Sequence, residues 1–322
     1  MYKHPIQTLT AAALLATAQA TLAAPAETKN VDASAKWMVH LDVDALMKST
    51  VAKHALESNP QLSGQKLQAL QTLTGINIKE GLHGVTVFGN GDPENGVIII
   101  HAEAKQDNLV SFAQLNDGYK AKNYKGQTIH SFPDKNKPGK RVSACFLPGS
   151  KIILAPQPGL VELGIDLLKG NRPAMDANSE TNALAEFQDT PVLLAYGDFA
   201  ALQKEKDKKK AAAFQHAKRL GLSLGESEGK VRGMLGVITE SAETALQLEN
   251  FFRGIIAMGQ LSRENNPALA SLADAVQVKR KESSVVGIEV EIPTQSLIEI
   301  GETLKKNKQK AKAAQEEGGI QQ

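Results

Sequence analysis

The run His40-Leu41-Asp42-Val43-Asp44 brings together residue types that often bind a divalent metal. Its context predicts a strand, in which alternate side chains share one face, so the histidine and the two aspartates would lie close together. Imidazole and carboxylate groups in that arrangement could hold a metal ion that activates water for hydrolysis. His101 and Glu103, on another predicted strand, are further candidate ligands.

Helix capping explains the same run without a metal. Asp42 ends the predicted strand and precedes a predicted helix, where an Asp side chain commonly accepts a hydrogen bond from a free backbone N–H group. A metal site also needs at least three converging ligands oriented by their neighbours. We therefore expect a cap, and we assign no catalytic, cofactor-binding or metal-binding residue and no cofactor. A hydrolase, metal-dependent around His40, Asp42 and Asp44, is the alternative.

Other patterns with chemical potential are incomplete. Ser63 and Lys66 have the S-x-x-K spacing of penicillin-recognising enzymes, but the S-D-N and K-T-G motifs that complete it are missing. The chain also has no H-E-x-x-H, phosphate-loop or C-x-x-C motif. The single cysteine, Cys145, lies in an apolar run, where we expect it to be buried and unreactive.

The first residues have the pattern of a secretory signal peptide. Lys3 and His4 form a basic start, and an Ala/Leu/Thr-rich stretch follows. Ala18-Gln19-Ala20 and Thr21-Leu22-Ala23 both fit a cleavage site, and we favour the second. A mitochondrial-type targeting peptide would contain arginine, which this segment lacks. We predict a signal peptide over residues 1–23, a flexible mature N-terminus over 24–35, and a periplasmic or extracellular location.

Charge and composition argue against several classes of protein. Lys and Arg total 37 against 35 for Asp and Glu, whereas nucleic-acid-binding domains carry a strong basic excess. Only 4% of the residues are aromatic, which argues against a sugar-binding platform. No later segment reaches the roughly 20 apolar residues of a transmembrane helix. We expect a small ligand or an envelope protein as the partner, no nucleic acid and no transmembrane segment.

Hydrophobic periodicity and turn residues predict an α+β fold with largely antiparallel strands. In one predicted helix, Leu246, Phe251, Ile255 and Met258 recur with a helical period and are expected in the core. Strands are predicted at 36–42, 83–89, 96–103, 126–132, 141–147, 150–155, 191–197, 229–239, 274–281 and 284–292. Helices are predicted at 43–57, 62–73, 107–115, 159–169, 199–220, 242–260 and 296–308.

Two parts of the chain resemble each other, which predicts an internal duplication. Asp42 and Asp198 each follow a strand and precede a helix. A second, ungapped match pairs Pro156, Leu160, Glu162, Gly164 and Leu167 with Pro293, Leu297, Glu299, Gly301 and Leu304. We predict two related α+β halves over residues 36–170 and 191–308, joined by a linker over 171–190. The polar residues 309–322 are predicted to form a disordered tail.

The order of these features resembles a family of uncharacterised secreted bacterial proteins. The residues that carry the resemblance are Trp37, His40, Asp42, Asp44 and Leu46, then the run Gly84-Val-Thr-Val-Phe-Gly89 and a second related half. The resemblance implies an envelope or extracellular protein of unknown function and assigns no catalytic residue. We predict a non-catalytic binding protein whose site lies between its halves, because domain junctions often hold ligands.

Overall fold

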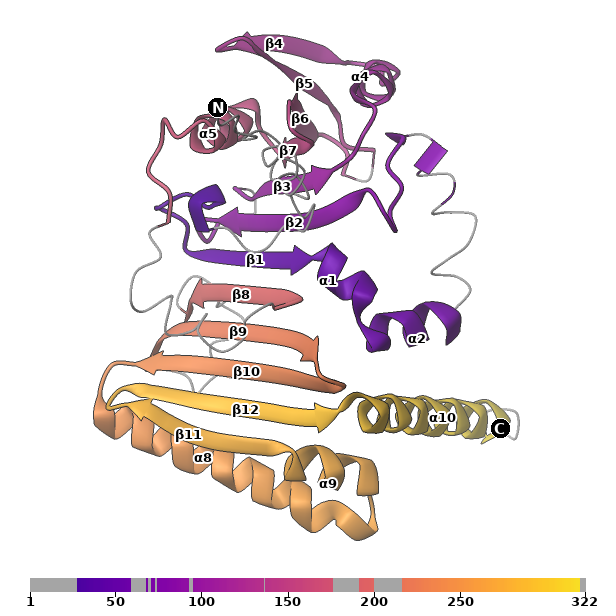
Figure 1. The fold of residues 1–322 in the computed structure, drawn as a ribbon, viewed down its shortest axis with the longest axis vertical. Helices are drawn as coiled ribbons and strands as arrows, with labels where there is room; N and C mark the ends of the chain where they lie inside the picture. The colour runs from indigo at the N-terminus through magenta and orange to yellow at the C-terminus, as the bar shows by residue number, and fades with distance from the viewer. Residues whose placement is uncertain are drawn as a thin grey trace, which may run out of the picture.

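The protein has an α+β architecture built on one large antiparallel sheet, seen in a computed structural model (Figure 1). The structure describes residues 28–58, 68, 71, 72, 74–92, 95–135, 137–175, 191–199 and 216–318. Of the elements predicted above, the helix at 62–73 falls almost wholly outside these residues. Within the described part, no helix is both long and apolar enough to cross a membrane.

Twelve strands form the sheet, in the order β11-β12-β10-β9-β8-β1-β2-β3-β7-β6-β5-β4. The central pair is β1 and β8, in which Met38 lies opposite Tyr196. The bounds are β1 (Trp37–Asp42), β2 (Leu82–Gly89), β3 (Val97–Ala102), β4 (Lys120–Tyr124), β5 (Gln127–Pro133), β6 (Arg141–Leu147), β7 (Lys151–Ala155), β8 (Leu193–Asp198), β9 (Ala217–Ser227), β10 (Lys230–Thr239), β11 (Val276–Glu282) and β12 (Val285–Pro293). The predicted antiparallel sheet is confirmed.

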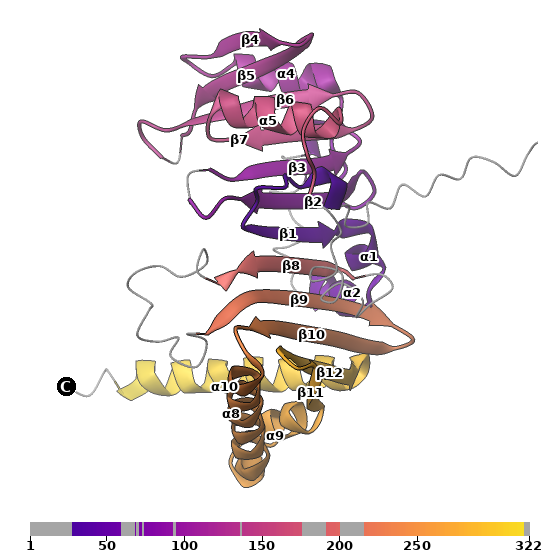
Figure 2. The same cartoon turned by 90° about the vertical axis from the view of Figure 1, so that its left-hand side faces the viewer.

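Helices cover both faces of the sheet near β7. Ile153 packs with Val161 and Ile165 of α5 (Pro158–Leu168). Its neighbour Ile152 packs instead with Leu109 of α4 (Gln106–Gln114). Successive side chains of a strand point to opposite faces, so α5 and α4 must lie on opposite sides of the sheet. The view in Figure 2 shows α5 lying across β6 and β7.

A different helix pair covers the far end of the sheet. Ala245 and Leu248 of α8 (Ala242–Leu261) are buried against Val237, Val278 and Val286. The helix α9 (Pro267–Asp274), which the sequence analysis did not predict, packs against α8 and β11. It starts at Pro267 behind Asn266, whose side chain accepts a hydrogen bond from the Leu269 backbone N–H. Proline is well suited to a first helical position because its missing N–H group is not needed there.

The core prediction for α8 is wrong. Phe251, Ile255 and Met258 are 44%, 45% and 66% exposed, and Leu246 is 46% exposed. The helix carries two apolar stripes, and the sheet takes only the one that contains Leu248. A helical period alone cannot tell which of two such stripes faces the core.

Two other predicted helices also differ from the structure. The helix predicted at 43–57 is broken at Ser49, whose extended backbone separates α1 (Val43–Lys48) from α2 (Thr50–Ser58). The helix predicted at 199–220 overlaps β9, which begins at Ala217. Residues 200–215 lie outside the described part of the chain. In β9, Leu220, Leu222 and Leu224 alternate with small residues, a strand pattern that the helix prediction overlooked.

The segment predicted to be flexible over 24–35 is ordered where the structure describes it. A short 3-10 helix, η1 (Thr28–Asn30), leads into Val31, which is fully buried. Asp32 forms an isolated bridge with Ala174 and an ion pair with Arg172. Burial alone would raise the pKa of Asp32, but hydrogen bonds from Arg172 and Ser34 outweigh it and hold that pKa below its usual value. The start of the predicted linker, 171–175, is therefore tied to the N-terminal segment.

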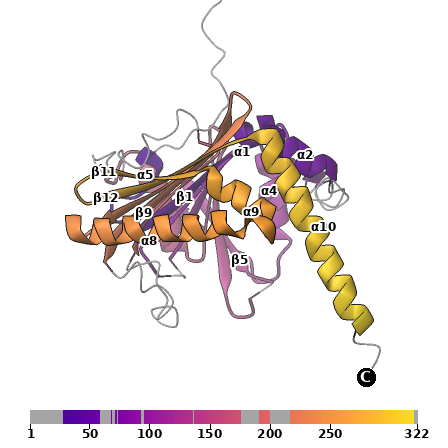
Figure 3. The same cartoon turned by 90° about the horizontal axis from the view of Figure 1, so that it is seen from below.

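The predicted disordered tail also differs from the structure. Helix α10 runs from Thr294 to Gly318 and so includes residues 309–318 of that tail. Lys, Gln, Ala and Glu dominate this stretch, and all four are good helix formers. Low apolar content was therefore a poor guide to disorder. Figure 3 shows α10 leading away from the sheet towards the C-terminus.

Candidate functional site

The predicted cap at Asp42 is present. The Asp42 carboxylate accepts a hydrogen bond from the Ala45 backbone N–H at 2.8 Å, at the start of α1. The matching residue Asp198 ends β8 and pairs instead with Lys36 and Arg219, each at 3.3 Å. Both aspartates thus have structural partners at the ends of the two central strands.

His40 and Asp44 do not meet. The His40 ring is buried on β1, and its Nδ1 lies 2.8 Å from the Thr86 hydroxyl on the neighbouring strand. Asp44 instead contacts His83, whose Nδ1 lies 3.1 Å from both carboxylate oxygens. No three His, Cys, Asp or Glu side chains among the described residues converge closely enough to hold a metal ion. The metal site considered from the sequence is therefore not assembled from these residues.

His83 is the residue that the sequence analysis missed at this place. A register shift between Leu82 and Gly84 brings it next to β3, where its ring centre lies 5.3 Å from that of His101. Its Nε2 is 3.7 Å from a Glu103 carboxylate oxygen. A bulge moves a side chain out of strand alternation, so counting every second residue could not bring these groups together.

The Asp44–His83 pair has the geometry of a base held by its orienting carboxylate. The His83 ring, however, is only 1% exposed, and its Nε2 has no hydrogen-bond partner within the described chain. A general base must come within hydrogen-bond reach of the proton that it removes. In this arrangement the pair ties α1 to β2, and the imidazole is shielded from solvent.

A serine in the second part of the sheet also matches a catalytic pattern that the sequence reasoning missed. Gly221-Leu222-Ser223-Leu224-Gly225 fits G-x-S-x-G, which in hydrolases requires a sharp turn from a strand into a helix. Here the run lies inside β9, with Ser223 opposite Leu194 and Met234. The Ser223 side chain is 1% exposed, and its hydroxyl has no hydrogen-bond partner among the described residues. Within the part of the chain that the structure describes, no base lies in hydrogen-bond contact with this hydroxyl, as a nucleophile would need.

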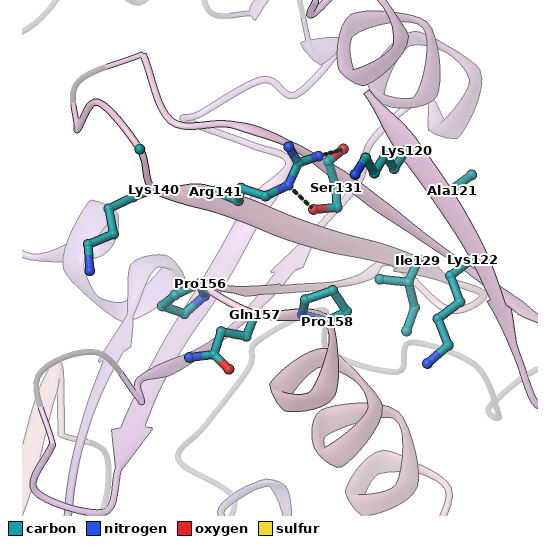
Figure 4. A pocket seen from close by; sticks show the side chains of 11 residues that line it. Lys120, Ala121, Lys122, Ile129, Ser131, Lys140, Arg141, Pro156, Gln157 and Pro158 are labelled. Carbon is teal, nitrogen blue, oxygen red and sulfur yellow. Dashed lines mark hydrogen bonds between the residues drawn. The ribbon is translucent and has the colours of Figure 1, made fainter. Parts of the chain in front are cut away.

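The two parts of the sheet meet where β1 and β8 pair directly. A cavity of about 500 Å³ lies instead beside β4, β5 and β6, within the first part (Figure 4). We call it the basic pocket. Its lining residues are Lys120, Ala121, Lys122, Ile129, Ser131, Gly139, Lys140, Arg141, Pro156, Gln157 and Pro158.

Strands β4, β5 and β6 and the segment between β7 and α5 set the shape of the basic pocket. Lys120 and Lys122 stand two residues apart on β4, so they share one face of this edge strand. Arg141 begins β6, and Pro156 to Pro158 connect β7 to α5. Figure 4 shows Lys140 and Lys122 on opposite sides, with Arg141 between them and the proline-containing segment facing it. Strand β4 lacks apolar alternation because it is an edge strand, which is why the sequence did not predict it.

Hydrogen bonds hold Arg141 in place. Its Nε donates to the Ser131 hydroxyl at 3.0 Å, and one terminal nitrogen donates to the Ser131 and Gly118 carbonyl oxygens at 2.8 and 2.9 Å. Lys122 reaches out to Glu162 of α5, with 2.6 Å between nitrogen and oxygen. No Asp or Glu is among the residues that line the pocket. The pocket therefore combines fixed donors and positive charge with apolar surface.

A second cavity, of about 570 Å³, lies where β12 leads into α10. We call it the acidic pocket, because Asp274, Glu291 and Glu299 line it. Glu291 pairs with Lys230 and Arg232, and Asp274 pairs with Arg263. Two of its acidic groups are thus already neutralised by partners within the chain.

Comparison with known proteins finds no matching family model and no matching curated protein. Solved structures of TP0453 are distantly similar. Crystal form III is 11% identical with a TM-score of 0.49, covering 86% of this chain and 97% of that one. Form IV is 10% identical (TM-score 0.46; 86% and 96% covered), and form I is 10% identical (TM-score 0.45; 88% and 98% covered). At this level of similarity, neither site residues nor an activity can be transferred.

Proposed function

We propose that this protein is a non-catalytic binding protein of the bacterial envelope or the secreted fraction, and that it takes a small ligand in the basic pocket. The observation that carries the proposal is the cavity itself. It has a volume of about 500 Å³, in the range of small-molecule sites, and it gathers polar donors and apolar surface from separate elements. The other candidate groups with catalytic potential, at His83 and Ser223, are buried.

A ligand screen tests the proposal on the mature protein. We expect a compound from a library of small metabolites to raise the unfolding temperature, and Gln157→Trp, on the segment that lines the pocket opposite Arg141, to abolish that rise by filling the basic pocket. The control is Ala268→Phe, which fills the acidic pocket and leaves the effect intact. Stabilisation that survives Gln157→Trp would contradict the proposed site.

A hydrolase is the second candidate function, and the Asp44–His83 pair is the observation that favours it. Exposure of His83 in another conformation would turn this oriented imidazole into a general base. A broad hydrolase screen of the wild-type protein and of His83→Gln distinguishes the two functions. Turnover that disappears in the folded variant would replace the binding proposal with this one.

The proposal includes export of the protein from the cytoplasm. The basic start, the Ala/Leu/Thr-rich stretch and the small residues before Ala24 support cleavage of a signal peptide over residues 1–23. A resemblance to uncharacterised secreted bacterial proteins supports the same location. N-terminal sequencing of the exported protein is expected to begin between Thr21 and Ala26, whereas an intact Met1 would refute cleavage.

We also propose that the two parts of the sheet arose by duplication. Outward from the central pair, the order β1-β2-β3-β7-β6 has the counterpart β8-β9-β10-β12-β11. Gly164 lies in α5 after β7, and its match Gly301 lies in α10 after β12. The hairpin β4–β5 is then an insertion in the first half. Homologous sequences test this: the matched positions should stay alike between halves, and divergence at all of them would count against duplication.

A further inference from the structure

Arg141 differs from the other arginines of the chain in its partners. Its hydrogen bonds go to neutral oxygens of Ser131 and Gly118, and no carboxylate among the described residues lies within ion-pair distance of it. Every other arginine pairs with a carboxylate, namely Arg172, Arg219, Arg232, Arg253, Arg263 and Arg280. Arg141 is therefore oriented but not neutralised, a state that favours an external anion.

The surroundings add charge of the same sign. Lys120 and Lys140 line the pocket with Arg141, and the side chain of Lys120 makes no ion pair within the described chain. Lys122 is offset by Glu162, just outside the lining. Like charges gathered in a concave surface focus the field and attract an ion of opposite sign. Arg141 and Lys120, two cations without an ion pair among the described residues, together favour a group that carries more than one negative charge.

The N-terminal end of α5 also favours an anion in the pocket. Pro158 occupies the first turn, and the side chain of the capping residue Gln157 makes no capping hydrogen bond. The N–H groups of Leu160 and Val161 already donate to the Gln157 carbonyl oxygen, so it is the helix dipole that favours a negative charge near this end. Because this helix end lies in the same cavity as Arg141, it adds to the field of the cations.

Apolar surface completes the pocket. Ile129, Pro156 and Pro158 face the same space as the cations. A free inorganic ion would leave this surface unused, whereas an organic group attached to the anion would cover it. Burial of apolar surface contributes about 25 cal/mol for each Å² removed from water.

The acidic pocket shows that positive charge is not a general property of cavities at a strand-to-helix connection in this molecule. It too lies where a strand leads through a proline into a helix, at Pro293, yet three carboxylates line it. The residues that make the first cavity basic come from β4 and the start of β6, and the second part of the sheet has no counterpart of β4 among its described strands.

We infer that the basic pocket binds the phosphate group of a small phosphate ester, with Arg141 as its main contact and Lys120 as a second. The inference rests on the proposed binding function and names the chemistry of the ligand. A phosphate monoester carries the double charge, offers oxygens for an oriented guanidinium and brings an organic group for the apolar wall.

Calorimetric titration of the mature protein with butyl phosphate tests the inference. We expect one molecule to bind per chain, more tightly than inorganic phosphate, while butanol does not bind. Arg141→Gln is expected to weaken binding about tenfold or more, since a charge-assisted hydrogen bond is lost. Arg263→Gln, which removes the same charge from a paired arginine in the second part, should change the dissociation constant less than about twofold.

Lys120→Met keeps the test decisive if Arg141→Gln fails to fold, because Lys120 is exposed on the edge strand. It should weaken binding severalfold and leave the unfolding temperature unchanged. Vesicles that contain phosphatidic acid separate the two sources of the phosphate. Binding to butyl phosphate assigns a soluble ester, and binding only to vesicles, lost in both variants, assigns a lipid headgroup; either result supports the site.

The inference is overturned if the folded wild-type protein binds none of these phosphates, or if both pocket variants bind as the Arg263→Gln control does. The proposed binding function is tested separately, by the ligand screen described above. A neutral library compound whose effect is blocked by Gln157→Trp would preserve the binding function and refute only the phosphate chemistry.

Discussion

Asp42 shows how one side chain can look catalytic and act structurally. Its carboxylate caps α1 through the Ala45 N–H. We expect Asp42→Ala to lower the free energy of unfolding by about 1 kcal/mol, the usual cost of a lost N-cap. Asp42→Asn should lie close to wild type in urea denaturation, because the amide oxygen can accept the same bond. Equal losses in both variants would mean that the charge of Asp42, rather than its cap, is what matters.

The reactivity of the Cys145 thiol can also be tested at the scale of a single residue. It is fully buried between Ile129 and Ile153 on the neighbouring strands, and burial raises the pKa of its thiol to about 11. At pH 8 only about one thiol in a thousand would be ionised, and the thiolate is the reactive form. We expect a thiol reagent such as DTNB to label the native protein at least about 100-fold more slowly than the urea-unfolded chain. Rapid, complete labelling of the native protein would contradict this.

At the scale of elements, the packing of α5 depends on a glycine. A Cβ atom at Gly164 would lie 2.9 Å from Cγ2 of Ile153, closer than side chains normally approach. We expect Gly164→Ala to destabilise the protein by about 1–3 kcal/mol, the range for overpacking a core. The cost would appear as a lower urea midpoint.

Gly301 provides the matched control for Gly164. It occupies the corresponding position in α10, where nothing lies within 4 Å of an added Cβ. Alanine there should stabilise the helix by about 0.5–1 kcal/mol, because glycine loses more backbone freedom on folding. A destabilised Gly301→Ala, or a neutral Gly164→Ala, would show that the two helices are not packed as described.

At the scale of the whole molecule, His130 links stability to pH. Its ring packs against Phe146, its Nδ1 lies 2.8 Å from the Tyr119 hydroxyl, and burial lowers its pKa below the usual 6.5. The unfolded chain therefore binds a proton more tightly than the native protein between that lowered pKa and about 6.5. Stability contributed by the neutral ring should be present above pH 6.5 and decline as the pH falls through this window.

The measurement is the urea midpoint between pH 7.5 and pH 5 for wild type and His130→Phe. We expect the decline on acidification to be smaller in the variant, whatever its stability at neutral pH. Slopes that coincide would exclude His130 as a source of the pH dependence. Comparing slopes also separates proton uptake from the lost contact with Tyr119.

Much of the local structure was predictable from the sequence, because the signals are local. Alternating apolar residues and turn residues predicted β1 to β3 and β5 to β7, and the carboxylate of Asp42 at the end of β1 predicted the cap of α1. The edge strand β4 escaped because it has no buried face and therefore no alternation. The end of α10 was judged by its low apolar content, although helix propensity was the better guide.

The candidate sites were decided by tertiary structure. Asp44 meets His83 only because a bulge shifts that ring between strands, and Arg141 joins Lys120 only because β4 and β6 flank β5 in the sheet. Sequence determines which groups a strand carries and how they alternate along it. Which strands become neighbours is determined by long-range pairing, since the burial of one element depends on every other element that packs against it.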